Sequence, residues 1–248
     1  PSGRGEVGQP PRRRYDSVMN ALPDLAAEAL NAAAQAARAA CVPLAAAPRA
    51  QKDKALLAAA AAIRAAGPKI LAANTEDLMA AENLSPAFQD RLTLTPVRIE
   101  AMARGVEEVA ALEDPAGRVL AEWTRPNGLR IRRVAQPIGV IGMVFESRPN
   151  VLADAGALCL KSGNAVILRG GRESVRSVSA IHAAMLAGLQ AAGLPEACIQ
   201  AAPNADRAFV GAMLQAAGLI DLIIPRGGKG LVQRVQADPF FQMFGGGM

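Results

Sequence analysis

The sequence predicts an α/β protein with a Rossmann-like open parallel sheet, an N-terminal helical segment and a β-hairpin arm. Three observations support this fold class. Residues 19–112 are rich in alanine and leucine with scattered charges, as in helices. An Asn-Gly pair follows between two short extended runs, and from Pro137 onward apolar runs alternate with amphipathic stretches of helical length. That alternation is typical of parallel strands joined by right-handed crossovers.

The first segment, residues 1–18, is predicted to be a disordered leader, because glycine, proline and arginine dominate it. We expect Met19, the first methionine, to be the natural start of the protein. Much of the net charge of +5 comes from arginines in this leader, and no basic stripe interleaved with aromatic residues follows it. We therefore expect no nucleic-acid partner.

Residues 19–112 are expected to form a series of helices. Proline and glycine interrupt the helical pattern at three places, namely Pro43, Pro48 and Gly67-Pro68. Two later helices are expected to begin at Pro86 and Pro96, because a serine or threonine precedes each proline and proline favours the first helical position.

A hairpin arm and then the sheet are expected to follow the helices. Residues 118–134 predict the hairpin, because Asn-Gly between two extended runs is the strongest short hairpin signal. Residues 137–237 predict a parallel α/β unit with four strands, at residues 138–145, 164–171, 198–203 and 219–225. Residues 238–248 fit no element of this fold and are set apart as an atypical tail.

The composition excludes several other classes of protein. The three cysteines, Cys41, Cys159 and Cys198, lie far apart and the chain has one histidine, so we expect neither a disulfide framework nor a metal site. We expect Cys159, Cys198 and His182 to be structural residues. No apolar run is long enough to span a membrane, and the cysteine usage fits a cytoplasmic protein.

Two loops of the predicted sheet suggest a phosphate-bearing ligand. Ligands of open parallel sheets bind beyond the carboxyl ends of the strands, and there residues 169–174 and 226–230 combine paired glycines with cations just before a helix. Glycine lets a phosphate approach the backbone, and helix N-termini and arginines attract anions. The alternative is that the glycines merely turn the chain, and neither loop is a Walker A or GxGxxG motif.

Three motifs carry a resemblance to a known family. They are PIGVIGMVFESRPNV at 137–151, LCLKSGNAVILRGG at 158–171 and IDLIIPRGGKGL at 220–231. Together they resemble the γ-glutamyl phosphate reductases (glutamate-5-semialdehyde dehydrogenases) of the aldehyde dehydrogenase superfamily. The resemblance covers about residues 20–236 and includes LAANTEDL, DRLTLTP and GLPEACIQ.

The resemblance implies an NADPH-dependent reduction of L-glutamyl 5-phosphate to L-glutamate 5-semialdehyde with release of phosphate, a step of proline biosynthesis. Residues 19–237 would then be the NADPH-binding domain. In this family the nucleophilic cysteine lies beyond the last motif, in a second domain that this chain does not contain. No catalytic residue is therefore assigned, and we expect an inactive fragment. The full-length enzyme is expected to be a homo-oligomer, since the hairpin resembles the superfamily's oligomerisation arm.

The resemblance also implies site residues. Those expected to bind the cofactor are Arg169, Gly170, Gly171, Arg172, Ser174, Gly227 and Gly228. Superfamily members commonly have lysine and glutamate where this chain has Arg169 and Arg172, and two arginines favour the 2′-phosphate of NADPH whereas a glutamate repels it.

The residues that the resemblance implies for substrate binding are Ser147, Arg148 and Asn150. Arg148 would bind the phosphate or carboxylate of the substrate, and Asn150 would donate to the developing oxyanion. The alternatives are a surface salt bridge for Arg148 and a helix cap for Asn150. Two other functions stay open, namely another member of the superfamily, and a nucleotide-binding or partner-binding module without catalysis.

Overall fold

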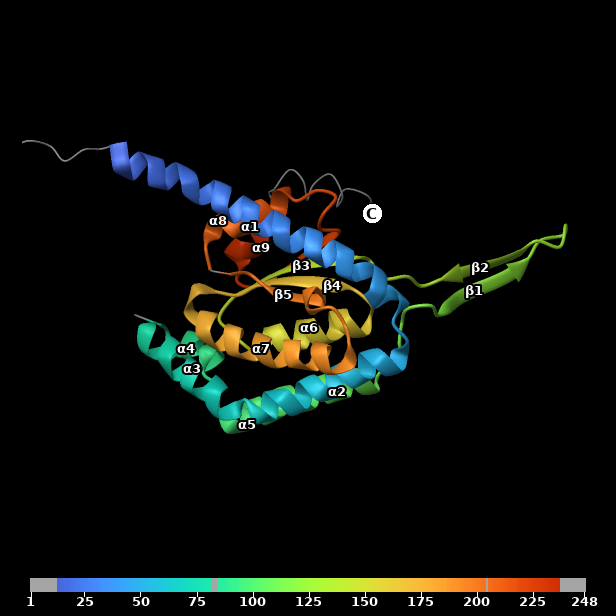
Figure 1. The fold of residues 1–248 in the computed structure, drawn as a ribbon, viewed down its shortest axis with the longest axis horizontal. Helices are drawn as coiled ribbons and strands as arrows, with labels where there is room; N and C mark the ends of the chain where they lie inside the picture. Colours follow the sequence, from blue (N-terminus) through green and yellow to red (C-terminus); the bar gives the residue numbers. More distant parts are fainter. Residues whose placement is uncertain (1–12, 82–83, 204, 237–248) are drawn as a thin grey trace, which may run out of the picture.

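A four-stranded parallel sheet lies between layers of helices, and a two-stranded hairpin projects from one side (Figure 1). The computed structural model describes residues 13–81, 84–203 and 205–236. The helices are α1 (Arg13–Ala46), α2 (Arg49–Ala65), α3 (Gly67–Ala80), α4 (Pro86–Leu92), α5 (Pro96–Ala111), α6 (Val151–Lys161), α7 (Val175–Ala192), α8 (Arg207–Gln215) and α9 (Lys229–Gln236). The strands are β1 (Val119–Thr124), β2 (Arg130–Val134), β3 (Val140–Phe145), β4 (Ala165–Arg169), β5 (Ile199–Ala201) and β6 (Leu222–Arg226), with single turns η1 (Arg172–Ser174) and η2 (Glu196–Cys198).

The sheet has the order β5-β4-β3-β6, and all its strands are parallel. The central strand β3 pairs with both β4 and β6, so that Gly142 is opposite Ile167 on one side and Ile223 on the other. All six residues of β3 are buried, as predicted from its continuous apolar run. The predicted parallel α/β fold is confirmed.

Each face of the sheet has its own apolar core. Side chains that alternate along β3 and β4 point to opposite faces, because successive residues of a strand do so. On one face Phe145 and Leu168 pack with α2, α5, α6 and α7, and on the other Val144 and Ile167 pack with α1 and α8. Figure 1 shows α1, α8 and α9 above the sheet and α6, α7, α2 and α5 below it.

The predicted hairpin arm is also confirmed. β1 and β2 pair antiparallel, with Glu122 opposite Arg132. The turn closes with Gly128 N donating to Arg125 O at 2.9 Å, and Gly128 has a φ of +86°. That left-handed conformation is the one for which glycine is favoured. Most residues of the arm are exposed, as its projection in Figure 1 indicates.

Helix α2 lies in the layer farthest from the sheet and packs along α7 (Figure 1). Its residues Leu56 and Ile63 are fully buried in the core that it shares with α7 and α5. Among the described residues no single helix is long and apolar enough to cross a membrane, although α2 and α3 together, bent by 65°, match a span in length and composition.

The structure corrects the predicted disordered leader. α1 begins at Arg13, so the prediction of disorder over residues 1–18 is wrong for residues 13–18, whereas residues 1–12 lie outside the described residues. No glycine or proline occurs between Pro11 and Pro23, and this stretch is therefore compatible with a helix despite its charge. α1 also continues through Pro43 to Ala46. The predicted tail, residues 238–248, lies outside the described residues.

Candidate cofactor and substrate sites

The loops that follow β3, β4 and β6 meet at the carboxyl edge of the sheet. They surround a cavity of about 540 Å³, which we name the glycine-loop cavity. It is lined by Phe88, Val144, Glu146, Arg169, Gly171, Arg172, Glu173, Ala205, Arg207, Val210, Gly230 and Leu231. Three arginines and two glutamates thus surround one space, and an anionic ligand is favoured there by the excess of positive charge.

Two glutamates that the sequence analysis did not nominate hold these loops together. Ser147 N donates to Glu173 Oε1 at 2.7 Å, which joins the loop after β3 to the loop after β4. Gly228 N donates to Glu146 Oε2 at 2.9 Å, which joins the loop after β3 to the loop after β6. In the sequence, both glutamates could have been recognised as carboxylates that lie within a few residues of a strand end.

The guanidinium of Arg169 has a hydrogen-bond partner at Nη2 but none at Nε among the described residues. Arg169 is 8% exposed, and its Nη2 donates to Ala205 O at 2.7 Å. Its Nε is buried and has no hydrogen-bond partner in the part of the chain that the structure describes. Burial lowers the pKa of Arg169, while Glu173 and Glu146 raise it. A buried donor without a partner costs free energy, so the site is suited to an added acceptor such as a phosphate oxygen.

Two of the four predicted glycines, Gly171 and Gly227, lie in very close contact with a glutamate side chain, and none of the four turns the chain through a positive φ. None of Gly170, Gly171, Gly227 and Gly228 is among the described glycines with positive φ. A Cβ at Gly171 would lie 2.0 Å from Glu173 Oε1, and one at Gly227 would lie 2.6 Å from Glu146 Oε2. Gly171 and Gly227 therefore leave room for the two glutamates that join the loops.

The predicted cofactor residues separate into three groups. Arg169, Gly171 and Arg172 line the glycine-loop cavity, and Gly170 lines an adjoining cavity of about 220 Å³ against α7. Gly227 and Gly228 lie beside Glu146 at the edge of the first cavity. Ser174 does not line either cavity, because its side chain is fully buried and its Oγ donates to Gly171 O at 3.2 Å. Its predicted contact with the cofactor stays a prediction.

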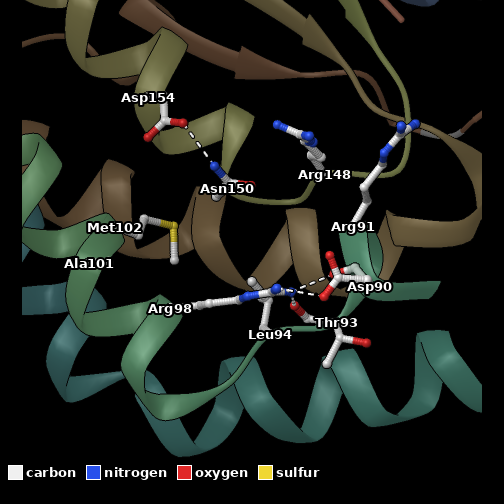
Figure 2. Close-up of a pocket in the computed structure, with 10 residues that line it drawn as sticks. All are labelled: Asp90, Arg91, Thr93, Leu94, Arg98, Ala101, Met102, Arg148, Asn150 and Asp154. Carbon is white, nitrogen blue, oxygen red and sulfur yellow. Dashed lines mark hydrogen bonds and ion pairs between the residues drawn. The ribbon is translucent and has the colours of Figure 1, made fainter. Parts of the chain in front are cut away.

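A second cavity, of about 380 Å³, lies where α4, the start of α5 and the start of α6 meet (Figure 2). We name it the α4–α6 cavity. It is lined by Asp90, Arg91, Thr93, Leu94, Arg98, Ala101, Met102, Arg148, Asn150 and Asp154. The structure thus brings Arg148 and Asn150 together, as predicted for substrate residues, and adds side chains from the DRLTLTP segment, for which the sequence analysis assigned no role.

The alternatives for Arg148 and Asn150 are not supported. The guanidinium of Arg148 makes no ion pair with any residue that the structure describes. The side chain of Asn150 does not cap α6, and its Nδ2 donates instead to Asp154 Oδ2 at 2.9 Å. Ser147 lies outside this cavity, since it is 3% exposed and has a φ of +53°. The backbone bends at Ser147, between the two cavities, and its side chain lines neither of them.

Two buried polar residues of α3 connect the surroundings of both cavities. Asn74 Oδ1 accepts from Leu94 N at 2.7 Å, next to the α4–α6 cavity. Asn74 Nδ2 donates to Ser177 Oγ at 3.1 Å, and Asp77 Oδ2 accepts from Ser177 N at 2.8 Å and from Ser177 Oγ at 2.7 Å. Ser177 lies in the first turn of α7, directly after the glycine loop 169–174. This network therefore holds one wall of each site.

Comparison with known proteins gives the family. Residues 11–239 match the model of the aldehyde dehydrogenase family. The chain belongs to the aldehyde dehydrogenase family. Aldehyde dehydrogenases are oxidoreductases, and membership of this family implies a nicotinamide cofactor.

Several curated relatives bear the name gamma-glutamyl phosphate reductase. The chain is 64% identical to the gamma-glutamyl phosphate reductase of Gluconobacter oxydans over 210 residues, which are 84% of this chain and 49% of that protein. It is 61% identical to that of Acidiphilium cryptum, over 84% of this chain and 50% of that protein. The chain therefore spans about half the length of the curated relatives it matches.

Solved structures agree with the fold. The gamma-glutamyl phosphate reductase of Thermotoga maritima superimposes with a TM-score of 0.82 at 38% identity, covering 84% of this chain and 51% of that one. The reductase of Saccharomyces cerevisiae superimposes with a TM-score of 0.76 at 33% identity, covering 82% and 52%. An acetylating aldehyde dehydrogenase of Geobacillus thermoglucosidasius, at 17% identity, shares the fold with a TM-score of 0.69.

The cysteines of this aldehyde dehydrogenase family member do not line the glycine-loop or α4–α6 cavity. Cys159 and Cys198 are buried, and burial raises the pKa of each thiol to about 12. His182 Nε2 lies 2.9 Å from Ile199 O, which supports its structural role. Among the described residues no group of His, Cys, Asp or Glu side chains could hold a metal ion.

We predict that a thiol reagent distinguishes these cysteines. With a pKa of about 12, only about one in ten thousand of the Cys159 and Cys198 thiols is ionised at about pH 8, and the thiolate is the reactive form. Ellman's reagent is therefore expected to react first with the half-buried Cys41, and with the other two only after unfolding in urea. Cys41→Ser should remove the early reaction. An early reaction that persists in this variant would contradict the prediction.

Proposed function

We propose that this chain forms the cofactor-binding half of an NADPH-dependent glutamate-5-semialdehyde dehydrogenase. The reaction is the reduction of L-glutamyl 5-phosphate to L-glutamate 5-semialdehyde with release of phosphate, in proline biosynthesis. The observation that carries the proposal is the glycine-loop cavity with Arg169, Arg172 and Arg207, in a chain 64% identical to a protein named gamma-glutamyl phosphate reductase. The proposed setting is the cytoplasm, and the full-length enzyme is proposed to be a homo-oligomer.

The residues of the glycine-loop cavity fit a nicotinamide dinucleotide. When bound, this cofactor supplies the hydride for the reduction. Arg169 and Arg172 would bind the 2′-phosphate that distinguishes NADPH from NADH, and the unpartnered Nε of Arg169 provides a donor for it. Gly227 and Gly228 would lie against the diphosphate, since glycine admits close approach and α9 begins at the next residue.

The residues of the α4–α6 cavity fit an acyl phosphate. Arg148 binds an acidic group of the substrate, because its guanidinium lines the cavity without an ion pair from the described residues. Asn150 Nδ2, which now donates to Asp154, is the donor for the oxyanion that develops at the acyl carbon. Arg91 adds positive charge to the same cavity, whereas the charge of Arg98 is offset by its ion pair with Asp90.

The chain by itself is proposed to bind the cofactor without turnover. An acyl phosphate reductase of this family needs a cysteine thiolate as nucleophile. The raised pKa and burial of Cys159 and Cys198 disfavour the thiolate, and Cys41 lies on α1, where it packs against the core between α1 and α8. These observations favour the second candidate function, a nucleotide-binding module without catalysis, for the isolated chain.

The cofactor preference provides the test. Arg172 is exposed at the cavity, and Arg172→Glu replaces a cation near the 2′-phosphate with an anion. We expect the ratio of the NADH to the NADPH dissociation constant to fall about 10-fold, which corresponds to about 1.4 kcal/mol. Isothermal titration calorimetry measures both constants. Arg132→Glu, on the hairpin arm, is the matched control and should leave the ratio unchanged. An unchanged ratio in Arg172→Glu contradicts the assignment.

A further inference from the structure

The charged side chains of the α4–α6 cavity divide into those that are paired and those that are not. Arg98 is fully engaged, because its Nη2 donates to Asp90 Oδ1 at 2.7 Å and its Nη1 donates to Thr93 O at 2.7 Å. These contacts fix the segment between α4 and α5. Arg91, Arg148 and Asp154 make no ion pair with any residue in the described ranges. The cavity therefore presents two unpaired cations and one unpaired anion.

Asp154 is the unusual member of this set. It lies in the first turn of α6 and is half-buried, and among the described residues its carboxylate accepts a hydrogen bond only from Asn150 Nδ2, at 2.9 Å. Burial raises its pKa, and the hydrogen bond from Asn150 and the charge of Arg226 offset this only in part. A carboxylate in a cavity wall without a cation within ion-pair distance is costly, and a bound cation would offset that cost.

The two unpaired arginines come from different parts of the chain. Arg91 is in the last turn of α4, and Arg148 is in the loop after β3. In Figure 2 Asp154 lies at the left of the cavity, Arg91 at the right, and Arg148 between them. A ligand that reaches from Asp154 to Arg91 therefore needs a cationic group at one end and acidic groups along the rest.

L-Glutamyl 5-phosphate has this pattern of charge, with one ammonium group, one carboxylate and one phosphate. We propose that Asp154 binds the α-ammonium group of this substrate and that Arg91 and Arg148 bind its two acidic groups. Asp154 thereby selects an amino-acid acyl phosphate over an acyl phosphate without an amino group. This inference rests on the proposed function, because the acyl phosphate is assigned there. The volume of about 380 Å³ is in the range of small-molecule sites.

Two stable probes that differ by one group test the assignment. L-2-amino-5-phosphonopentanoate has an ammonium, a carboxylate and a phosphonate, whereas 5-phosphonopentanoate lacks the ammonium. The 248-residue chain is expected to bind the amino probe about 10-fold more tightly, as measured by isothermal titration calorimetry. Asp154→Asn should abolish this difference without weakening the binding of 5-phosphonopentanoate. Arg91→Gln should weaken both probes about 10-fold.

Controls separate this proposal from the function on which it rests. Arg104→Gln, on an exposed face of α5, should alter the affinity for neither probe. NADPH titration of each variant shows that it is folded, and Arg172→Glu should alter only cofactor binding. If the chain binds both probes equally, or if Asp154→Asn weakens both equally, the role of Asp154 is wrong although the acyl phosphate site stands. If neither probe binds while NADPH does, the acyl phosphate assignment itself fails.

Discussion

Replacing Gly188 with alanine is expected to lower the free energy of unfolding by about 3 kcal/mol. Gly188 lies on the face of α7 that packs against α2. A Cβ there would lie 2.5 Å from the carbonyl oxygen of Ala55, 2.5 Å from Ala59 Cβ and 2.7 Å from Ala59 N. Two of these atoms belong to the backbone of α2 and cannot rotate away, so the two helices would have to separate.

Gly105 provides the matched control for this substitution. It also lies inside a helix, α5, but nothing lies within 4 Å of a Cβ built there. Gly105→Ala is expected to stabilise the protein by about 0.5–1 kcal/mol, the usual gain in helix propensity. Urea unfolding followed by far-UV circular dichroism measures both variants. A shift of both midpoints in the same direction would show that the contact between α2 and α7 is not what requires glycine.

Replacing Asp77 with alanine is also expected to cost about 3 kcal/mol, because hydrogen bonds to a buried charge are among the stronger ones. Its carboxylate is 2% exposed and accepts from Ser177 N, Ser177 Oγ and Arg176 N. These donors lie in the first turn of α7, where the helix dipole favours a negative charge. Without Asp77 the two backbone N–H groups lose their acceptor and the first turn of α7 loosens.

Glu76→Ala is the control for charge alone. Glu76 is the neighbouring carboxylate, is 65% exposed and forms an ion pair with Arg176 Nε at 3.2 Å. Exposed ion pairs contribute little to the free energy of unfolding. The loss of the Glu76–Arg176 pair is therefore expected to cost less than about 0.5 kcal/mol in the same urea experiment. Equal losses for Glu76→Ala and Asp77→Ala would mean that surface charge, rather than the buried network, stabilises the start of α7.

The sheet could be predicted from the sequence because its signals are local. The apolar run of β3 and the glycine pairs at the strand ends each lie within a few residues, and the positions of the strand ends determine where the loops meet. The loop that carries Arg169 and Arg172 was found in this way, whereas the role of these two residues follows from the resemblance to the family. The sequence did not show why glycine occurs at Gly171 and Gly227, because Glu173 and Glu146 approach these positions only in the folded chain.

The α4–α6 cavity and its supporting network could not be found from local patterns. Arg91 and Asp154 are far apart in sequence, and each by itself looks like an ordinary charged residue at a helix end. Asn74 and Asp77 lie in a helix whose pattern gives no sign that they are buried, since their partner Ser177 is on α7. Only the packing of α3 against α7 shows their role.

The position of the hairpin arm determines which part of the protein is monitored by intrinsic tryptophan fluorescence. Trp123 is the only tryptophan of the chain, lies in β1 and is 44% exposed. β1 and β2 pair only with each other among the described strands, and a two-stranded hairpin is marginal by itself, so it can open while the central sheet stays intact. Intrinsic tryptophan fluorescence therefore follows the arm and not the core. An unfolding midpoint obtained from this emission describes a local event, separate from the loss of the helices.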